Sequence, residues 1–204
     1  MKRIAVLASG RGSNFQAVLD AIGAETIPAE CVCLITDNPG AYAITRAERA
    51  GVPVRVIDYS AYSSKDAYED ALLSAMAACR ADLFVLAGYM RIVGSRIVEA
   101  FAGRMINIHP ALLPAFPGLH AQRQAISYGV KVAGCSVHFV DSGMDSGPII
   151  IQACVPVLEG DDEESLSARI LEEEHRALPA AISLFCEGRV MVEGRQVRIL
   201  PRAE

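Results

Sequence analysis

Two polar residues of suitable type and spacing for catalysis, Asn107 and His109, lie in the stretch NIHPALLP at residues 107–114. In a strand they would share a face, because alternate residues point to the same side. Ligands of open α/β sheets bind beyond the carboxyl ends of the strands. An amide and an imidazole at such an end can stabilise a developing oxyanion and transfer a proton. A single histidine is more often a core residue, so the pair is a candidate catalytic site with a structural alternative.

A third candidate is Asp145, in the connection SGMDSGP, with Ser136 and His138 on one face of the strand that precedes it. An aspartate among glycines is commonly a turn residue. A carboxylate close to His109 would instead manage its proton. Periodicity leaves the distance between Asp145 and His109 open, so both interpretations stand.

The stretch SGRGSN, residues 9–14, is a candidate anion site. Glycines after a strand let the backbone turn tightly and direct N–H groups at an anion, and the next helix adds its dipole. The stretch matches neither GxxxxGK[ST] nor GxGxxG, which disfavours a nucleoside triphosphate or a dinucleotide. With Ser13 and Asn14 as small donors, a phosphate monoester fits better. The alternative is a plain turn in which Ser13 caps the helix.

Several other chemistries are disfavoured. The four histidines show no HxxxH or HxH spacing and the six cysteines no CxxC spacing, so we expect no metal centre. We expect the cysteines to be buried free thiols in a reducing cytoplasm. The absence of a GxSxG elbow argues against an acyl-enzyme. A transfer in which the substrate supplies its own nucleophile remains.

The elements that would position these residues alternate along the chain. Hydrophobic patterns predict strands at 2–8, 31–37, 52–58, 82–88 and 104–110, separated by helices at 13–22, 41–51, 65–80 and 95–101. Two longer strands at 131–141 and 147–157, a helix at 163–187 kinked at Pro179, and a hairpin at 188–200 follow. This order predicts an α/β fold: a single-domain, Rossmann-like, doubly wound sheet, mostly parallel with an antiparallel C-terminal excursion.

Composition agrees with one soluble domain. The chain has 204 residues, 52% of them hydrophobic, which is enough for a full core. Its net charge of -5 gives no electrostatic footprint for nucleic acid or an anionic membrane. The acidic run at 161–164 suits a helix start. Because no segment reaches 18 uninterrupted apolar residues, we expect no membrane span and a cytoplasmic location.

The motifs together resemble the phosphoribosylglycinamide formyltransferases, folate-dependent enzymes of purine synthesis. The resemblance runs through VLASGRGSNFQA, LAGYMRIV, NIHPALLPAFPGLHAQRQA, GCSVHFVDSGMDSGPIIIQ and ARILEEEH, in the family's order. NIHPALLP is shared with other 10-formyltetrahydrofolate enzymes, whereas SGRGSN narrows the acceptor. The resemblance implies one formyltransferase domain over 1–204, with a phosphate-binding half at about 1–100 and a folate and catalytic half at about 101–204.

The same resemblance implies the binding residues. Gly12, Ser13 and Asn14 would hold the 5-phosphate of glycinamide ribonucleotide, and Glu174 would contact its glycinamide or ribose part. The 141–145 loop would close over the folate. The residues that would bind 10-formyltetrahydrofolate are Lys65, Met90, Arg91, Ile92, Val93, Asn107 and Val140.

The implied reaction is a direct transfer without a metal or a covalent enzyme intermediate, in the synthesis of inosine monophosphate. The primary amine attacks the formyl carbon on N10 of the folate. Asn107 and protonated His109 would stabilise the oxyanion of the tetrahedral intermediate. Asp145 would keep His109 charged and help move the proton to N10. The partners would be small molecules, and the protein a monomer or homodimer.

Three rival functions are distinguishable. A methionyl-tRNA formyltransferase adds a C-terminal domain and needs a basic RNA-binding surface, unlike a chain of net charge -5. A formyltetrahydrofolate hydrolase would use the same trio with water as acceptor, and usually carries an N-terminal domain. A non-catalytic phosphometabolite sensor would tolerate loss of Asn107 or Asp145, both of which are present.

Overall fold

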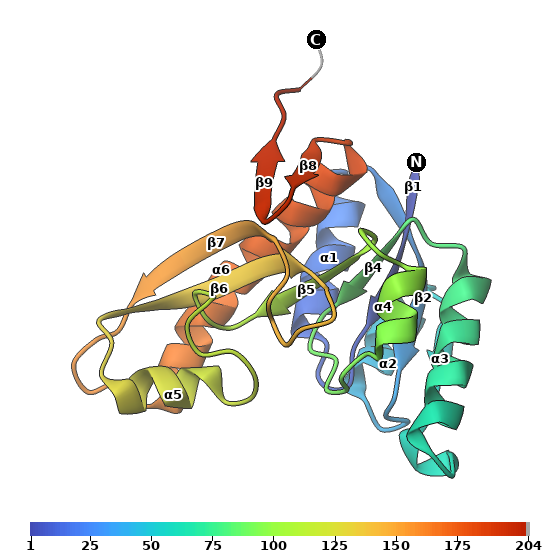
Figure 1. The fold of residues 1–204 in the computed structure, drawn as a ribbon, viewed down its shortest axis with the longest axis horizontal. Helices are drawn as coiled ribbons and strands as arrows, with labels where there is room; N and C mark the ends of the chain where they lie inside the picture. The colour runs from blue at the N-terminus through green and yellow to red at the C-terminus, as the bar shows by residue number, and fades with distance from the viewer. Residues whose placement is uncertain (203–204) are drawn as a thin grey trace. The chain divides into compact units, whose positions relative to one another are not determined.

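The computed structural model describes residues 1–202 and divides into two compact units, with the boundary between Ile106 and Asn107 (Figure 1). The first unit contains β1 (Lys2–Leu7), α1 (Ser13–Gly23), β2 (Ala29–Thr36), α2 (Tyr42–Arg49), β3 (Val54–Val56), the 3₁₀ helix η1 (Tyr59–Ala61), α3 (Lys65–Cys79), β4 (Leu83–Leu86), α4 (Ser95–Ala100) and the first residues of β5 (Met105–His109). The second contains the rest of β5, α5 (Ala121–Tyr128), β6 (Val132–Phe139), β7 (Ile149–Pro156), α6 (Glu163–Cys186), β8 (Val190–Glu193) and β9 (Gln196–Ile199).

The first unit is built on parallel strands. β1 pairs in parallel with both β2 and β4, and β2 pairs in parallel with β3, which gives the order β3-β2-β1-β4. All four residues of β4 are buried, as expected for a strand covered on both faces. The predicted alternation of strands and helices is confirmed here. The carboxyl ends of these strands carry the loops discussed below.

Three local features of the first unit depart from the predictions. The third strand covers only 54–56, because Pro53 has no N–H to donate and Val52 donates to Ala47 O at the end of α2. A bulge lies in β2, where Ile4 pairs with Cys31 but Ala5 pairs with Cys33. The 3₁₀ turn at Tyr59–Ala61, closed by the Asp58 side chain, was not predicted.

The second unit contains the antiparallel excursion. β6 and β7 pair antiparallel from Val132↔Pro156 to His138↔Ile149, and α6 packs against both strands. The acidic run begins α6 as predicted, with Asp162 as N-cap in a capping box with Ser165. The predicted kink would fall at Pro179, which lies inside one continuous helix.

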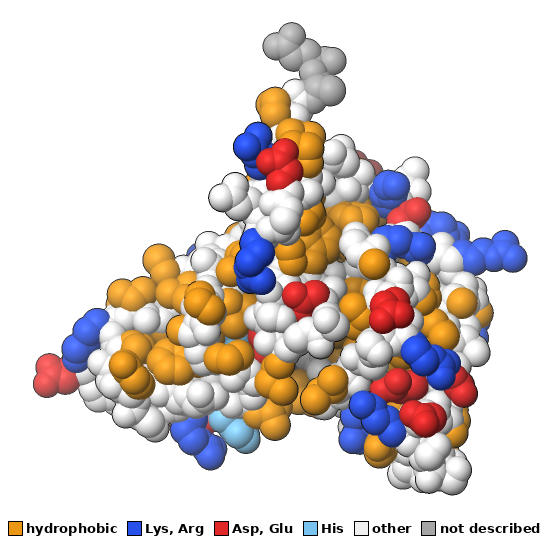
Figure 2. All heavy atoms as spheres, in the orientation of Figure 1, with side chains coloured by type: hydrophobic (Ala, Val, Ile, Leu, Met, Phe, Trp, Pro, Cys, Tyr) orange, Lys and Arg blue, Asp and Glu red, His pale blue; other side chains and the backbone are white. Residues whose placement is uncertain are grey.

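Helix α5 was not predicted from the sequence. Its N-cap, His120, is in the left-handed region and makes no capping hydrogen bond with its side chain. Only Ala121 and Ala125 are buried, so no apolar stripe marks the helix in the sequence. Hydrophobic side chains gather over α5 and the β6–β7 pair on the face seen in Figure 2.

The C-terminal hairpin, β8–β9, forms as predicted and is anchored at its base. Arg189 Nε donates to Leu200 O at 2.7 Å, and its guanidinium also pairs with Glu187 at 2.8 Å. Arg202 reaches the same carboxylate at 3.1 Å. These contacts hold the pKa of Glu187 low, at about 2, first through Arg189 and then through Arg202. The hairpin therefore starts from a fixed base.

All six cysteines are free, as predicted, but they are not all buried. Cys154 is exposed because it lies on the outer face of β7, opposite Gly134. The expectation of a buried thiol is wrong for Cys154, and Cys31 and Cys186 are only partly buried. Within residues 1–202, no helix is long and apolar enough to cross a bilayer.

Candidate active site

Four polar side chains of the second unit converge at the end of β5. Asn107 Nδ2 lies 3.2 Å from His138 Nε2, His109 Nδ1 lies 3.4 Å from Asp145 Oδ2, and His138 Nε2 lies 3.7 Å from Asp145 Oδ1. Asn107 and His109 share one side of the strand, and Ile108 between them is buried. The structure thus brings together the three candidate catalytic residues of the sequence and adds His138 to them.

The imidazole of His109 is almost fully buried and lies between two oxygen acceptors. Nε2 is 2.8 Å from the Phe116 carbonyl, to which it donates, and Nδ1 faces the Asp145 carboxylate. Each ring nitrogen of His109 therefore has an oxygen acceptor within reach.

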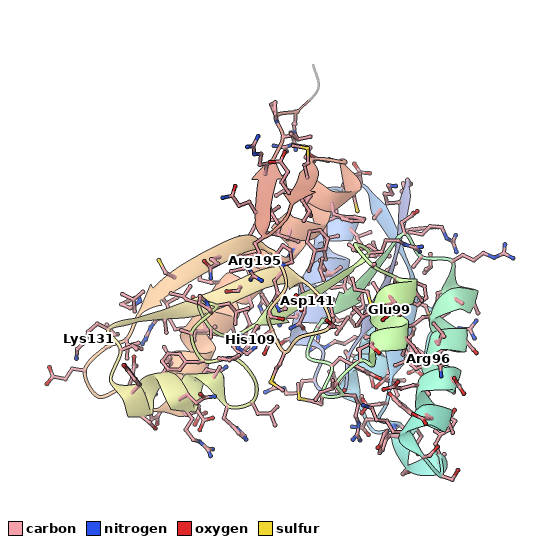
Figure 3. All side chains as sticks on the ribbon, in the orientation of Figure 1. Arg96, Glu99, His109, Lys131, Asp141 and Arg195 are labelled. Atoms are coloured by element: carbon pink, nitrogen blue, oxygen red, sulfur yellow. The ribbon has the colours of Figure 1, made fainter. Side chains whose placement is uncertain are left out.

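Asp145 is held in a left-handed conformation, with φ 49°, in the loop between β6 and β7. Its Oδ2 accepts the Gly118 N–H at 2.8 Å. The loop is closed on itself, because Asp141 Oδ1 accepts both the Gly143 N–H at 3.1 Å and the Ser146 hydroxyl at 2.6 Å. Figure 3 labels His109 on β5 and Asp141 in this loop. The backbone thus fixes the place of the Asp145 carboxylate.

His138 is a neutral acceptor that orients Asn107. Its Nδ1 donates to the Phe139 carbonyl at 2.8 Å, and burial lowers its pKa despite that hydrogen bond and the charge of Asp145. A neutral ring that donates from Nδ1 can only accept at Nε2. Asn107 must therefore turn its NH₂ group towards His138, and one amide hydrogen remains for a ligand.

The buried His138 predicts a pH dependence of stability. A histidine whose pKa is lower in the folded protein than its ordinary 6.5 disfavours folding once the unfolded chain is protonated. Above about pH 6.5, we expect His138 to have no effect on how the free energy of unfolding changes with pH. Below that pH, we expect the free energy of unfolding to fall by up to about 1.4 kcal/mol per pH unit because of His138. Urea unfolding of wild type and His138→Asn from pH 7.5 to 5 measures the difference. Equal slopes for the two proteins would contradict the assignment.

The segment after His109 is fixed by two residues that sequence patterns did not single out for this role. The buried Ser136 hydroxyl donates to Ala111 O at 2.7 Å and accepts the Leu113 N–H at 3.0 Å. Gln152 Nε2 donates to Leu113 O at 2.9 Å. These hydrogen bonds join β6 and β7 to the turn that contains the His109 partner, Phe116.

In the first unit, the SGRGSN loop is shaped by α2. Gly12 is the N-cap of α1, with φ 67°, and a Cβ there would lie 2.8 Å from the Ala43 Cβ. Arg46 Nε donates to Arg11 O at 2.9 Å. Ser13 is the first helical residue, and α1 has no side-chain cap, so the capping alternative for Ser13 is not observed. Helix N-termini without a side-chain cap suit anions.

The GYMRIV stretch is fixed by residues that follow β1 and β2 in the same unit. The Met90 N–H donates to Ser9 Oγ at 2.8 Å, and Arg91 pairs with the buried Asp37 at 2.8 Å. Met90 and Ile92, by contrast, are 65% and 73% exposed. Exposed apolar side chains on a fixed backbone are suited to binding a flat apolar ring.

The remaining predicted binding residues lie as follows. Lys65 is exposed and pairs with Glu69 at 3.4 Å. Glu69 also lies against Gly94, which directly follows the GYMRIV segment, because a Cβ at Gly94 would clash with the Glu69 carboxylate. In the second unit, Val140 follows β6 and is half-buried, and Glu174 is buried on α6.

Ser9, Asp37 and Glu69 were missed as supporting residues. Asp37 could have been noticed, because it directly follows the second strand, at the edge where α/β sheets bind ligands. Within residues 1–202, no group of three or more His, Cys, Asp or Glu side chains could hold a metal ion.

Comparisons with known proteins agree on one family. The formyl transferase family profile matches residues 2–182. The phosphoribosylglycinamide formyltransferase of Bacillus subtilis is 44% identical over 182 residues, covering 89% of this chain and 93% of that protein. The crystal structure of glycinamide ribonucleotide transformylase 1 from Symbiobacterium toebii superposes with a TM-score of 0.96 at 56% identity, covering 98% of this chain and 95% of that one.

Some relatives are much longer, and one is named for a different activity. The trifunctional purine biosynthetic protein adenosine-3 of Drosophila melanogaster is 46% identical over 193 residues, which is 94% of this chain but 14% of the fly protein. A formyltetrahydrofolate deformylase from Pseudomonas syringae has a TM-score of 0.91 at 26% identity, covering 98% of this chain and 66% of that one. The fold alone therefore does not select the formyl acceptor.

Proposed function

The chain belongs to the formyl transferase family, and we propose that it transfers the formyl group of 10-formyltetrahydrofolate to the amine of N1-(5-phosphoribosyl)glycinamide. The products would be the formylated ribonucleotide and tetrahydrofolate. The observation that supports this reaction is the convergence of Asn107, His109 and Asp145 at the end of β5. We further propose that residues 1–204 act as one formyltransferase domain, since the family profile runs through both units.

In the proposed mechanism, the substrate amine attacks the formyl carbon and forms a new C–N bond. The formyl oxygen becomes an oxyanion, which accepts from the free Asn107 amide hydrogen and from His109. Each such donor contributes roughly 3 kcal/mol to transition-state stabilisation. His109 Nε2 now donates to Phe116 O, so its N–H must exchange that carbonyl for the oxyanion.

Collapse of the intermediate breaks the bond from the formyl carbon to N10. The attacking amine loses one proton and N10 gains one, so the transfer is balanced without an external acid. Asp145, beside His109, is the proposed proton carrier. Proton transfer by a positioned group is worth about 10²- to 10⁴-fold in rate.

The proposed binding residues divide by substrate. Gly12, Ser13 and Asn14 would bind the phosphate of the ribonucleotide, and Glu174 its glycinamide or ribose. The folate would contact Lys65, Met90, Arg91, Ile92, Val93, Asn107 and Val140. The support in the first unit is the uncapped start of α1 and the exposed apolar side chains of the GYMRIV segment. We propose a metal-free enzyme of the cytoplasm that acts on small molecules.

Replacement of both Ser13 and Asn14 by alanine tests the phosphate assignment. We expect the KM for the ribonucleotide to rise about ten- to a hundredfold with kcat nearly unchanged, because two donors to a charged phosphate are lost. Steady-state kinetics with each substrate varied in turn measure this effect. A matched control is Thr26→Ala, another hydroxyl of the same unit beyond the end of α1. A raised KM for folate alone would contradict the assignment.

The decisive experiment for the function is an absorbance assay for folate product with and without glycinamide ribonucleotide. A transferase requires the ribonucleotide, whereas a deformylase releases tetrahydrofolate at the same rate without it. Product formation that is independent of the ribonucleotide would overturn the proposal.

The enzyme is expected to keep its full activity after dialysis against a chelator. A loss of activity that a divalent metal restores would overturn the metal-free mechanism.

A further inference from the structure

The tip of the C-terminal hairpin contacts the loop that carries Asp145. A guanidinium nitrogen of Arg195, in the turn between β8 and β9, donates to the Ser146 carbonyl at 2.9 Å. Ser146 directly follows Asp145 in the chain, and Figure 3 shows Arg195 beside the loop that also contains Asp141. The hairpin lies outside residues 2–182, which the family profile matches. The contact therefore joins an element beyond the matched region to the candidate site.

The loop has a reason to need external support. Asp145 adopts φ 49°, in the left-handed region, which aspartate tolerates better than most residues with a Cβ but which is less favourable than the right-handed region. Such a conformation persists only where its surroundings over-determine it. Inside the loop, the support is the Asp141–Ser146 hydrogen bond and the closure at Gly147, where a Cβ would clash with Phe139 O. Arg195 adds a contact from outside the loop.

Arg195 can act as a support because the hairpin is itself fixed. Arg189 ties the two ends of the hairpin together through Leu200 O, and Glu187 binds both Arg189 and Arg202. β9 also packs against β7, the strand into which the loop leads. A hydrogen bond from a guanidinium to a carbonyl is charge-assisted, which makes it stronger than one between neutral groups.

We propose that Arg195 is a positioning residue for Asp145, holding the 141–147 loop through the Ser146 carbonyl so that the carboxylate stays beside His109. This inference rests on the proposed function for its effect on turnover. The support of the loop itself is independent of the reaction.

The test uses the full chain and the variants Arg195→Ala, Arg195→Lys and Arg198→Ala. Arg198 lies on the same hairpin and pairs with Glu193 at 3.0 Å, so its removal changes the net charge equally without touching the loop. Hydrogen–deuterium exchange of the 141–147 amides and steady-state kinetics are measured for each protein. For Arg195→Ala we expect several-fold faster exchange at 141–147 and about a three- to tenfold lower kcat, with both KM values unchanged. Arg195→Lys should recover part of both, and Arg198→Ala should match wild type.

The outcomes separate this inference from the proposed function. Unchanged exchange at 141–147 in Arg195→Ala, or an equal rise in Arg198→Ala, overturns the support by Arg195. Faster exchange with an unchanged kcat in an active enzyme overturns the positioning of Asp145. A wild type without formyl transfer overturns the proposed function, while the exchange measurement still decides whether Arg195 holds the loop. Faster exchange throughout 190–199 would show that the hairpin had merely detached, which also overturns the inference.

Discussion

Asp145→Asn is expected to lower kcat by about 10²- to 10⁴-fold while leaving the KM for the ribonucleotide nearly unchanged. The substitution keeps the size of the side chain, and the amide oxygen can still accept the Gly118 N–H. What is lost is the negative charge beside His109 and the capacity to carry a proton. The proposed phosphate site at the start of α1 is untouched, so binding of the ribonucleotide should survive.

The measurement is steady-state kinetics with the ribonucleotide varied at saturating folate. A matched control is Asp141→Asn, which removes a carboxylate from the same loop and retains an oxygen that can accept the Gly143 N–H. We expect a much smaller loss for that control. If turnover of Asp145→Asn equals that of wild type, Asp145 has no part in proton transfer.

Asn107→Ala is expected to lower kcat by about 10²- to 10³-fold, or roughly 2.7–4 kcal/mol of transition-state stabilisation. The alanine removes the proposed oxyanion donor. It also leaves the buried His138 Nε2 without the amide that now donates to it. The second effect should appear as a modest loss of stability, because an unsatisfied buried acceptor costs about 1–3 kcal/mol.

Two measurements separate these effects. Kinetics report the lost donor, and thermal unfolding reports the unsatisfied histidine. Gln124→Ala is the control, since it deletes an amide of the same unit that donates to Leu119 O at 2.8 Å, away from His138. A kcat for Asn107→Ala close to that of Gln124→Ala would exclude Asn107 as an oxyanion donor.

The sheet was largely predictable because its elements have strong periodicity. The uninterrupted apolar run of β4 predicts a buried strand. The hydrophobic patterns of β6, β7 and α6 are longer and predict their element types clearly. Helix α5 escaped prediction because only two small residues of it face the core. The length of β3 was overestimated, because the hydrophobic run in the sequence includes Val52 and Pro53. Pro53 cannot donate a backbone hydrogen bond, and the strand begins only at Val54.

The candidate site was predictable only in part, for a similar reason. Asn107 and His109 share a face because of strand geometry alone, which a period of two reveals. The approach of Asp145 to His109 depends on a left-handed residue in a loop, which no periodicity reports. Likewise Ser9 and Met90 are 81 residues apart in the chain, and only the folded sheet brings them together.

The hydrogen bond from His109 to the Phe116 carbonyl affects whether His109 would bind the substrate or the transition state more tightly. A neutral formyl oxygen accepts hydrogen bonds about as well as a backbone carbonyl, so exchanging one for the other gains the bound substrate little. An oxyanion is a much stronger acceptor than either. The exchange becomes favourable only as charge develops on the formyl oxygen, so this donor would bind the transition state in preference to the ground state. Such a contact raises kcat without tightening substrate binding.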